Sequence, residues 1–213
     1  MPDAGADPAL VAAWLAARSI SRGLPAPVPD HGGLRVDTGS ASESRRYVFA
    51  GPTPGLTELA RIVRDPLAVL KLCGPPAQLQ AALSARWAAG QSGSLMVCDH
   101  PMPRRQVPPG YRVGLQPEGG AIRCTIATSA GDVAATGHAA ETEGVFIFDR
   151  IVTEAPHRRR GLGAALMTAL AQARRDPSSR FVLVATPAGR LLYETLGWSE
   201  LSPYSTARLN PDA

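Results

Sequence analysis

The sequence predicts an α/β (α+β) fold in which a mixed, mostly antiparallel sheet is flanked by helices. Three strand-like segments at 121–128, 133–140 and 145–152 follow one another through short polar turns, which is typical of antiparallel neighbours. An apolar helix is expected over 162–174, and a wholly apolar strand over 181–185 comes next. Because a helix carries the chain back across the sheet, the strands on either side of it should be parallel.

The first half is expected to alternate helices and strands as well. A helix over 8–21 would place Leu10, Val11, Trp14 and Leu15 on one face, and a loop rich in proline and glycine follows at 22–33. Further strands are predicted at 34–37, 46–50, 67–72 and 94–98, and further helices at 56–64 and 77–87.

A proline-rich segment over 101–110 predicts a linker that divides the chain nearly in half. One pattern recurs on both sides of it at a constant spacing. Arg64-Asp65-Pro66 returns as Arg175-Asp176-Pro177, and Pro76-Ala77 with Trp87 returns as Pro187-Ala188 with Trp198. We interpret the halves as related domains over 1–105 and 110–213; chance similarity between two alanine-rich segments is the alternative.

Composition narrows the classes of function. The 213 residues carry a net charge of +4, which suits an anionic ligand. The arginine clusters lack the interleaved aromatic residues of a nucleic-acid surface, so no nucleic-acid partner is expected. No stretch approaches the ~18 apolar residues of a membrane span, and the N-terminus does not resemble a secretory signal. Three cysteines without metal-ligand spacing predict reduced thiols, no metal and a cytoplasmic protein.

The turn between the strand at 145–152 and the helix that starts at Leu162 predicts an anion site. Amides in the first turn of a helix have no intrahelical partner, and the helix dipole adds positive charge there. Gly161 and Gly163 remove Cβ atoms that would hold a phosphate away from the backbone, while Arg158 to Arg160 add charge. No Gly-Lys-Ser/Thr follows, and Arg158 stands where a dinucleotide fingerprint has its first glycine, so neither nucleotide motif applies.

The pattern Arg158-x-x-Gly161-x-Gly163 resembles the coenzyme-A motif of the GNAT N-acetyltransferase superfamily. A second segment, Leu192-Tyr193-Glu194-Thr195-Leu196-Gly197-Trp198, is similar to the family's Tyr-x-x-Leu-Gly-Phe/Trp signature. The resemblance covers about residues 111–209 and implies a GNAT-like fold there. The first half is interpreted as a degenerate GNAT-like repeat that lost the cofactor site, because the segment around 47–52 lacks the matching glycines and arginines.

The resemblance implies transfer of an acetyl group from acetyl-CoA to a primary amine by direct attack. In the family, the pantetheine arm of the cofactor lies between two splayed strands and pairs with a free strand edge. The cofactor-binding residues carried over are Ile151, Val152, Thr153, Arg158, Arg159, Arg160, Gly161, Leu162, Gly163 and Ala164. The amine must be neutral when it attacks, and the leaving thiolate must receive a proton.

Tyr193 is the expected acid, as the resemblance implies. Its place on the flank of the apolar stripe of its helix would let the ring pack while the hydroxyl reaches a cleft. The alternative is an aromatic residue that only closes the core.

The base is less defined. Ile147 stands where several family members have a catalytic carboxylate, and Ile147, Asp149, Ile151 and Thr153 are expected to share one face of their strand. Asp149 is therefore the substitute candidate, acting directly or through water; a structural pair with an arginine is its alternative. Further candidates are Glu141, Glu143, Glu154 and His138.

The acceptor is a small-molecule or peptide amine that the sequence does not identify, and a monomer and a homodimer both stay open. Trp14, Trp87, Tyr47 and the loop over 22–33 are candidates for lining its site. The alternative function is a non-catalytic acetyl-CoA sensor or protein-interaction module, which would keep the phosphate site without turnover. Tyr193 argues against that alternative, and Ile147 argues for it.

Overall fold

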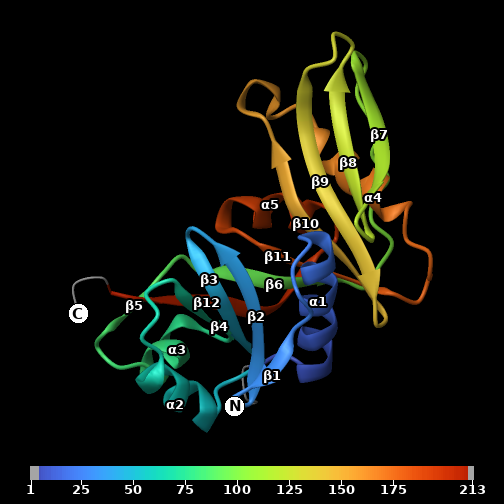
Figure 1. Cartoon of the computed structure of the whole chain (residues 1–213). Coiled ribbons are helices and arrows are strands. Elements are labelled where there is room, and N and C mark those ends of the chain that lie inside the picture. The colour runs from blue at the N-terminus through green and yellow to red at the C-terminus, as the bar shows by residue number, and fades with distance from the viewer. Residues whose placement is uncertain (1–4, 211–213) are drawn as a thin grey trace.

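The computed structural model describes residues 5–210, which form one twelve-stranded mixed sheet with helices on both faces (Figure 1). The strands are β1 (Val28–Asp30), β2 (Gly33–Ser40), β3 (Glu43–Phe49), β4 (Ala68–Cys73), β5 (Trp87–Ala89), β6 (Gly93–Cys98), β7 (Tyr111–Glu118), β8 (Ala121–Thr128), β9 (Val133–Thr142), β10 (Val145–Thr153), β11 (Arg180–Ala185) and β12 (Ser199–Leu209). The helices are α1 (Pro8–Ser21), α2 (Pro54–Ile62), α3 (Pro76–Ala82), α4 (Leu162–Ala171), α5 (Pro187–Thr195) and the 3-10 turn η1 (Ala155–His157). The predicted fold class, a mixed and largely antiparallel sheet flanked by helices, is confirmed.

Local sequence determines where most helices begin. Asp7 accepts a hydrogen bond from an amide in the first turn of α1 at 2.9 Å, and Thr53 and Thr186 do the same for α2 and α5 at 3.2 and 3.1 Å. A proline occupies the first turn of each of these helices, where its missing N–H costs nothing. Helix α4 differs, because it begins at Gly161 without a side-chain cap.

The two faces of the sheet are covered differently. Helix α1 packs on one face against β8, β9 and β10. Residues of β10 alternate between the faces: Ile147 joins the core beneath α1, whereas Phe146 and Phe148 join the core beneath α4 and α5. In the first half, Phe49 and Leu72 belong to a third core with residues of α2 and α3, on the face away from α1.

The two halves repeat one connectivity and exchange their last strands. Strands β3 and β4 are parallel with α2 between them, and β10 and β11 are parallel with α4 between them. The sheet order is β1-β2-β3-β4-β12-β6-β11-β10-β9-β8-β7, and β5 pairs with β12. Strand β6 from the first half thus pairs with β11, and β12 from the second half pairs with β4. Figure 1 shows β12, in red, among the strands of the first half.

Most predicted elements are present with small changes in their ends, and the predicted parallel pair is confirmed. The helix expected over 77–87 ends at Ala82, because Trp87 starts β5 and its indole N–H donates to the Ala60 carbonyl at 2.8 Å. Strands β1, β5, β7 and β12 were not predicted. Pro203 argued against a central strand at β12, and the structure accommodates it next to a register shift between Glu200 and Ser202. Among the described residues, no helix has the length and apolar character needed to cross a membrane.

Candidate functional site

Strands β10 and β11 separate part of the way along their length. They pair only from Val145 to Ile147, opposite Arg180 to Val182. Beyond Ile147, β10 continues to pair with β9, while the rest of β11 pairs with β6. The edge of β10 that faces β11 is therefore open from Phe148 to Thr153, the stretch that includes the predicted pantetheine-binding residues Ile151, Val152 and Thr153.

A β-bulge lies in the open part of β10. The register with β9 shifts between Asp149 and Val152, and Arg150 has a left-handed φ of 53°. The extra residue reverses the alternation of side chains. Asp149 thus faces α1 as Ile147 does, whereas Ile151 packs against the core beneath α4. The expectation that Ile147, Asp149, Ile151 and Thr153 share one face was wrong, because strict alternation does not continue through a bulge.

The start of α4 lies next to the open end of β10 and offers unpaired amides. Gly161 has a left-handed φ of 76°, and the first intrahelical bond runs from the Ala165 amide to the Gly161 carbonyl at 3.1 Å. The amides of Leu162, Gly163 and Ala164 donate to no acceptor in residues 5–210. Unpaired amides at a helix start, together with the helix dipole, form a ready anion site.

The two glycines of the motif have different structural reasons. A Cβ on Gly161 would meet no described atom within 4 Å, so the left-handed backbone is what favours glycine there. A Cβ on Gly163 would lie 2.8 Å from a side-chain methyl of Leu192 in α5. Gly163 therefore leaves room for the Leu192 side chain of α5 beside the helix start, a contact that the sequence did not reveal.

The three arginines of the turn are exposed around this helix start. Arg158 Nε donates to the carbonyl of Thr153 at 3.1 Å and ties the turn to the end of β10. Arg160 Nη1 donates to the Tyr111 hydroxyl at 3.2 Å, and that oxygen lies 3.0 Å from His157 Nδ1. The side chain of Arg159 has no hydrogen bond or ion pair with the described residues. All three arginines lie in the turn that leads into the unpaired amides of α4.

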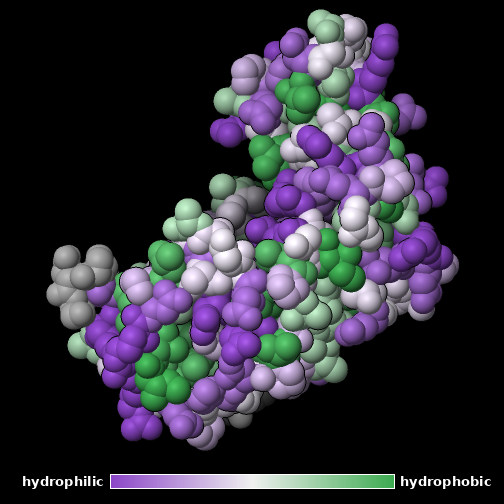
Figure 2. Space-filling model, viewed as in Figure 1, coloured by the Kyte–Doolittle hydropathy of each residue, from purple (hydrophilic) through white to green (hydrophobic). Residues whose placement is uncertain are grey.

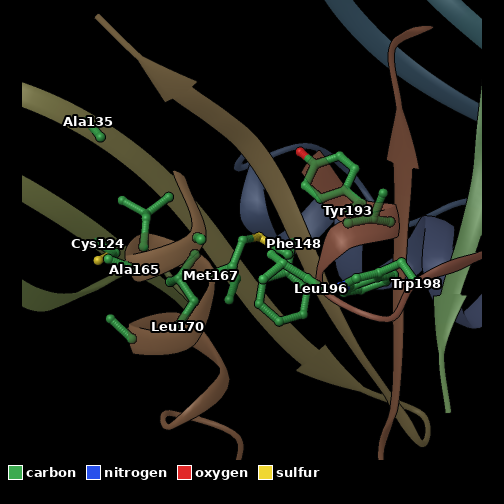
Figure 3. Close-up of a cluster of buried hydrophobic side chains, with 14 of the residues drawn as sticks. Cys124, Ala135, Phe148, Ala165, Met167, Leu170, Tyr193, Leu196 and Trp198 are labelled. Atoms are coloured by element: carbon green, nitrogen blue, oxygen red, sulfur yellow. The ribbon is translucent and has the colours of Figure 1, made fainter. Parts of the chain in front are cut away.

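Tyr193 is buried with its ring against Trp198, at 6.2 Å between ring centroids. Figure 3 shows its hydroxyl pointing away from Trp198 and Leu196, out of the apolar cluster. The hydroxyl makes no hydrogen bond with the described residues. Burial, with a smaller contribution from the charge of Asp149, raises the pKa of Tyr193 to about 12. The phenol is therefore protonated at neutral pH, the form that a general acid requires.

Asp149 is held in an ion pair with α1. Arg22 donates from Nε and Nη2 to the two carboxylate oxygens at 2.6 and 2.7 Å, and Ser21 Oγ donates at 3.0 Å. These three donors occupy both oxygens of the carboxylate, so Asp149 faces α1 and offers no free oxygen to an acceptor. The geometry thus matches the alternative interpretation of Asp149, the structural pair with an arginine.

The other candidate bases lie in turns or in packed positions. Glu141 accepts hydrogen bonds from the amides of Arg175 and Asp176 at 2.8 and 3.0 Å. Glu143 is exposed in the β9–β10 turn, and Glu154 is exposed immediately before η1. His138 is buried opposite Asp149 in the β9–β10 ladder, and burial lowers its pKa.

A cavity of about 230 Å³ reaches the gap between β10 and β11 from the side of α1. Figure 2 shows hydrophilic side chains along the hollow between the two halves of the molecule. The cavity is lined by Trp14, Arg18, Arg22, Arg46, Lys71, Gln91, Ser92, Gly93, Ile147, Phe148, Asp149, Val184, Ala185, Thr186, Tyr204 and Thr206.

The sequence identified only part of this lining. Trp14 and Arg22 were candidates and contribute to it, whereas Trp87 and Tyr47 lie in the core beneath α2, on the other face of the sheet. The polar residues from β3, β4 and β12 were missed. Lys71 offered a signal, because it interrupts the apolar run of β4 and is the only lysine in the sequence.

Comparison with known proteins finds a family match within the second half of the chain. Residues 120–200 match the family model of the acetyltransferase (GNAT) domain. No curated protein matches the chain. The chain is similar in structure to a GCN5-related N-acetyltransferase from Kribbella flavida, at TM-score 0.70 and 15% identity over 96% of each chain. It also resembles a tandem GNAT protein from the clavulanic acid biosynthesis pathway, at TM-score 0.59 and 15% identity over 84% of this chain and 79% of that chain.

A third structure of the same fold is a GCN5-related N-acetyltransferase from Sphaerobacter thermophilus, at TM-score 0.59 and 13% identity over 83% of this chain and 76% of that chain. At these identities the structural likeness establishes the fold. Residues 120–200, which match the GNAT family model, contain the parted strands and the open helix start and lie in a sheet that both halves of the chain build.

Proposed function

We propose that the protein is an N-acetyltransferase that moves the acetyl group of acetyl-CoA to a primary amine by direct attack. One observation carries the proposal: the gap between β10 and β11 lies next to the uncapped start of α4, so a strand edge and unpaired amides adjoin. A cofactor with a diphosphate and an amide-bearing arm matches these two features in charge and in hydrogen bonding.

The residues divide between two binding tasks. The amides of Leu162, Gly163 and Ala164 would hold the diphosphate, with Gly161 setting the turn. Arg158, Arg159 and Arg160 would add charge around it. The backbone of Ile151, Val152 and Thr153 would pair with the amides of the pantetheine arm, as an added strand pairs with a sheet edge.

In the proposed reaction, the amine nitrogen bonds to the thioester carbonyl carbon and the carbon–sulfur bond breaks. Tyr193 would give its proton to the leaving thiolate, and the amine would lose its proton to solvent. Tyr193 has the required protonated form and a hydroxyl without a competing partner. Asp149 would act mainly by holding α1 at the reaction site, because Arg22 and Ser21 already occupy its oxygens.

We further propose that residues 1–105 and 110–213 are two related domains and that the first has lost its cofactor site. The shared order of strand, helix, parallel strand and helix supports this relation, as does the likeness to a tandem GNAT protein. The exchange of β6 and β12 fits two repeats that pair as the subunits of a dimer would.

A non-catalytic acetyl-CoA sensor is the second candidate. The ion pair of Asp149 and the apolar Ile147 favour it, since neither offers a free carboxylate at the gap.

Two measurements on one preparation separate the candidates. Calorimetry reports acetyl-CoA binding, and a thiol reagent reports coenzyme A released with a panel of primary amines. The proposal expects binding and amine-dependent thiol release. Binding without release from any amine would support the sensor, and an absence of binding would overturn both.

A further inference from the structure

We propose that the cavity beneath α1 binds an anionic group of the acceptor, so that the acceptor is a small amine carrying a carboxylate or a phosphate group. The inference rests on the acetyl transfer proposed above. It also names a binding site distinct from that of the cofactor, because none of the proposed cofactor-binding residues lines the cavity.

The polar floor of the cavity comes from three neighbouring strands. Arg46 of β3, Lys71 of β4 and Tyr204 of β12 all line it. Lys71 Nζ donates to Thr206 Oγ1 at 2.8 Å and lies 5.6 Å from the centre of the Tyr204 ring. Arg46 also forms an ion pair with Glu43, with 2.7 Å between Nη2 and Oε1. These groups lie close together on the α1 face of the sheet.

Two donors on this floor lack a partner. The Tyr204 hydroxyl is fully buried, in a residue that is 5% exposed, and it has no hydrogen bond. Arg46 Nε is also buried without an acceptor in residues 5–210. Buried polar groups are nearly always paired in folded proteins, because an unpaired one costs about 1–3 kcal/mol. Two such donors beside a lysine call for an acceptor that residues 5–210 do not supply.

The charge in the cavity is unbalanced. Four basic side chains line it, Arg18, Arg22, Arg46 and Lys71, against the single carboxylate of Asp149. Arg22 pairs with the Asp149 carboxylate. Glu43, which does not line the cavity, partly neutralises the charge of Arg46. An oxyanion that contacts Arg46, Lys71 and Tyr204 would satisfy the donors and reduce the excess of positive charge.

The same charge explains how an acceptor could react without a dedicated base. Cations close to an amine disfavour its ammonium form and lower its pKa. The cavity reaches Phe148, Ala185 and Thr186, where β10 and β11 have parted, so an amine anchored by its anionic end could extend toward the gap. A polycationic acceptor would be repelled. The volume of about 230 Å³ is below the ~300–1,000 Å³ of pockets for drug-sized ligands, which favours a small molecule.

Three amines of similar length, β-alanine, 2-aminoethyl phosphate and propylamine, test the charge preference together with the longer polycation spermidine. Thiol release should show a kcat/KM at least about tenfold higher for one of the first two, since a charged hydrogen bond contributes about 1.5–3 kcal/mol. The comparison of β-alanine with 2-aminoethyl phosphate shows whether the cavity prefers a carboxylate or a phosphate group. Higher activity with propylamine or spermidine would overturn the anion site and leave acetyl transfer standing.

Matched variants locate the effect. Arg46→Met should remove the preference, whereas Arg45→Met should keep it, because Arg45 is half-exposed, forms an ion pair with Asp37 and does not line the cavity. Tyr204→Phe is a second variant of the site, which keeps the test valid if Arg46→Met fails to fold. It removes an unpaired hydroxyl, so it should weaken the acceptor (a raised KM) while the unfolding midpoint stays unchanged or rises. An unchanged KM in Tyr204→Phe and Arg46→Met would contradict the site.

Calorimetry with inorganic phosphate tests the cavity without turnover. Wild type and Arg45→Met should show a phosphate-binding event that Arg46→Met and Tyr204→Phe weaken at least about fivefold, the size of a net hydrogen bond of about 1 kcal/mol. If this pattern appears and no amine releases thiol, the anion site stands and the proposed acetyl transfer fails. Equal phosphate binding by all four proteins would overturn the anion site.

Discussion

The two halves of the molecule contain equivalent helices that begin in opposite ways. Helix α4 starts at Gly161 and leaves the amides of its first turn unpaired. In α2, Thr53 caps the Leu56 amide at 3.2 Å and Pro54 has no N–H to offer. The helix start is also obstructed, because a Cβ on Gly55 would lie 1.8 Å from the carbonyl oxygen of His31. One helix start is open to a ligand, and the other is satisfied and covered by its own chain.

The parallel strands that flank these two helices also differ, closed in the first half and open in the second. Strands β3 and β4 stay paired through five successive positions, from Arg45 to Phe49. Strands β10 and β11 pair through three positions and then part at Ile147. A cofactor arm could enter only the second pair. The shared connectivity of the two halves is therefore not enough to form a cofactor site. The site depends on which hydrogen bonds each half leaves unmade.

The largest expected effect comes from closing the open helix start. Gly161→Val places a β-branched residue at φ 76°, so the turn should change shape and misdirect the amides. Losing two or more hydrogen bonds to a charged group, each about 1.5–3 kcal/mol, should weaken acetyl-CoA binding by at least about 100-fold in calorimetry. Gly144→Val is the control, because Gly144 has a similar φ of 73° in the β9–β10 turn. Undiminished affinity in Gly161→Val would contradict the cofactor site.

The next effect concerns the chemical step. Tyr193→Phe keeps the ring in the apolar cluster and removes the hydroxyl, so turnover should fall by about 100-fold while acetyl-CoA affinity stays the same. Thiol release and calorimetry measure the two quantities. Tyr47→Phe, a buried tyrosine in the core of the first half, should leave turnover unchanged. Equal turnover in Tyr193→Phe would make the tyrosine structural only.

The smallest expected effect concerns the capped helix start of α2 in the first half. Thr53→Ala removes the cap of α2 and should lower the free energy of unfolding by about 1 kcal/mol, measured with urea. It should not alter acetyl-CoA binding, because Pro54 and His31 still close that helix start. Thr186→Ala is the matched variant on α5: its stability should fall equally, and turnover should fall too, since α5 carries Tyr193. A change in cofactor affinity in Thr53→Ala would contradict the contrast between the halves.

Sequence patterns predicted what depends on neighbours along the chain. The helix over 8–21, the strand over 121–128 and the parallel pair around α4 follow from capping, turns and apolar periodicity, and the structure confirms them. Strand β12 was hidden because Pro203 disfavours a central strand, and the side to which Ile151 points depends on a bulge that strict alternation cannot reveal.

The candidate site divides in the same way. The glycine-bearing helix start was visible as a local motif, and Asp149 was visible as a polar residue on its strand. Its partner Arg22 lies more than a hundred residues away along the chain and could not be assigned. The cavity joins Arg46, Lys71 and Tyr204 from three strands that become neighbours only when β12 inserts beside β4.

The exchange of β6 and β12 has a consequence for how the molecule can be divided. Each of these strands pairs with a strand of the other half of the chain. A fragment that ends before residue 110 would therefore lack β12 and leave one edge of β4 exposed. Such an edge is a template for aggregation. By contrast, a protease cut between Cys98 and Tyr111 would break the chain but leave β6 and β12 paired in the sheet. The two fragments should therefore elute together in size-exclusion chromatography.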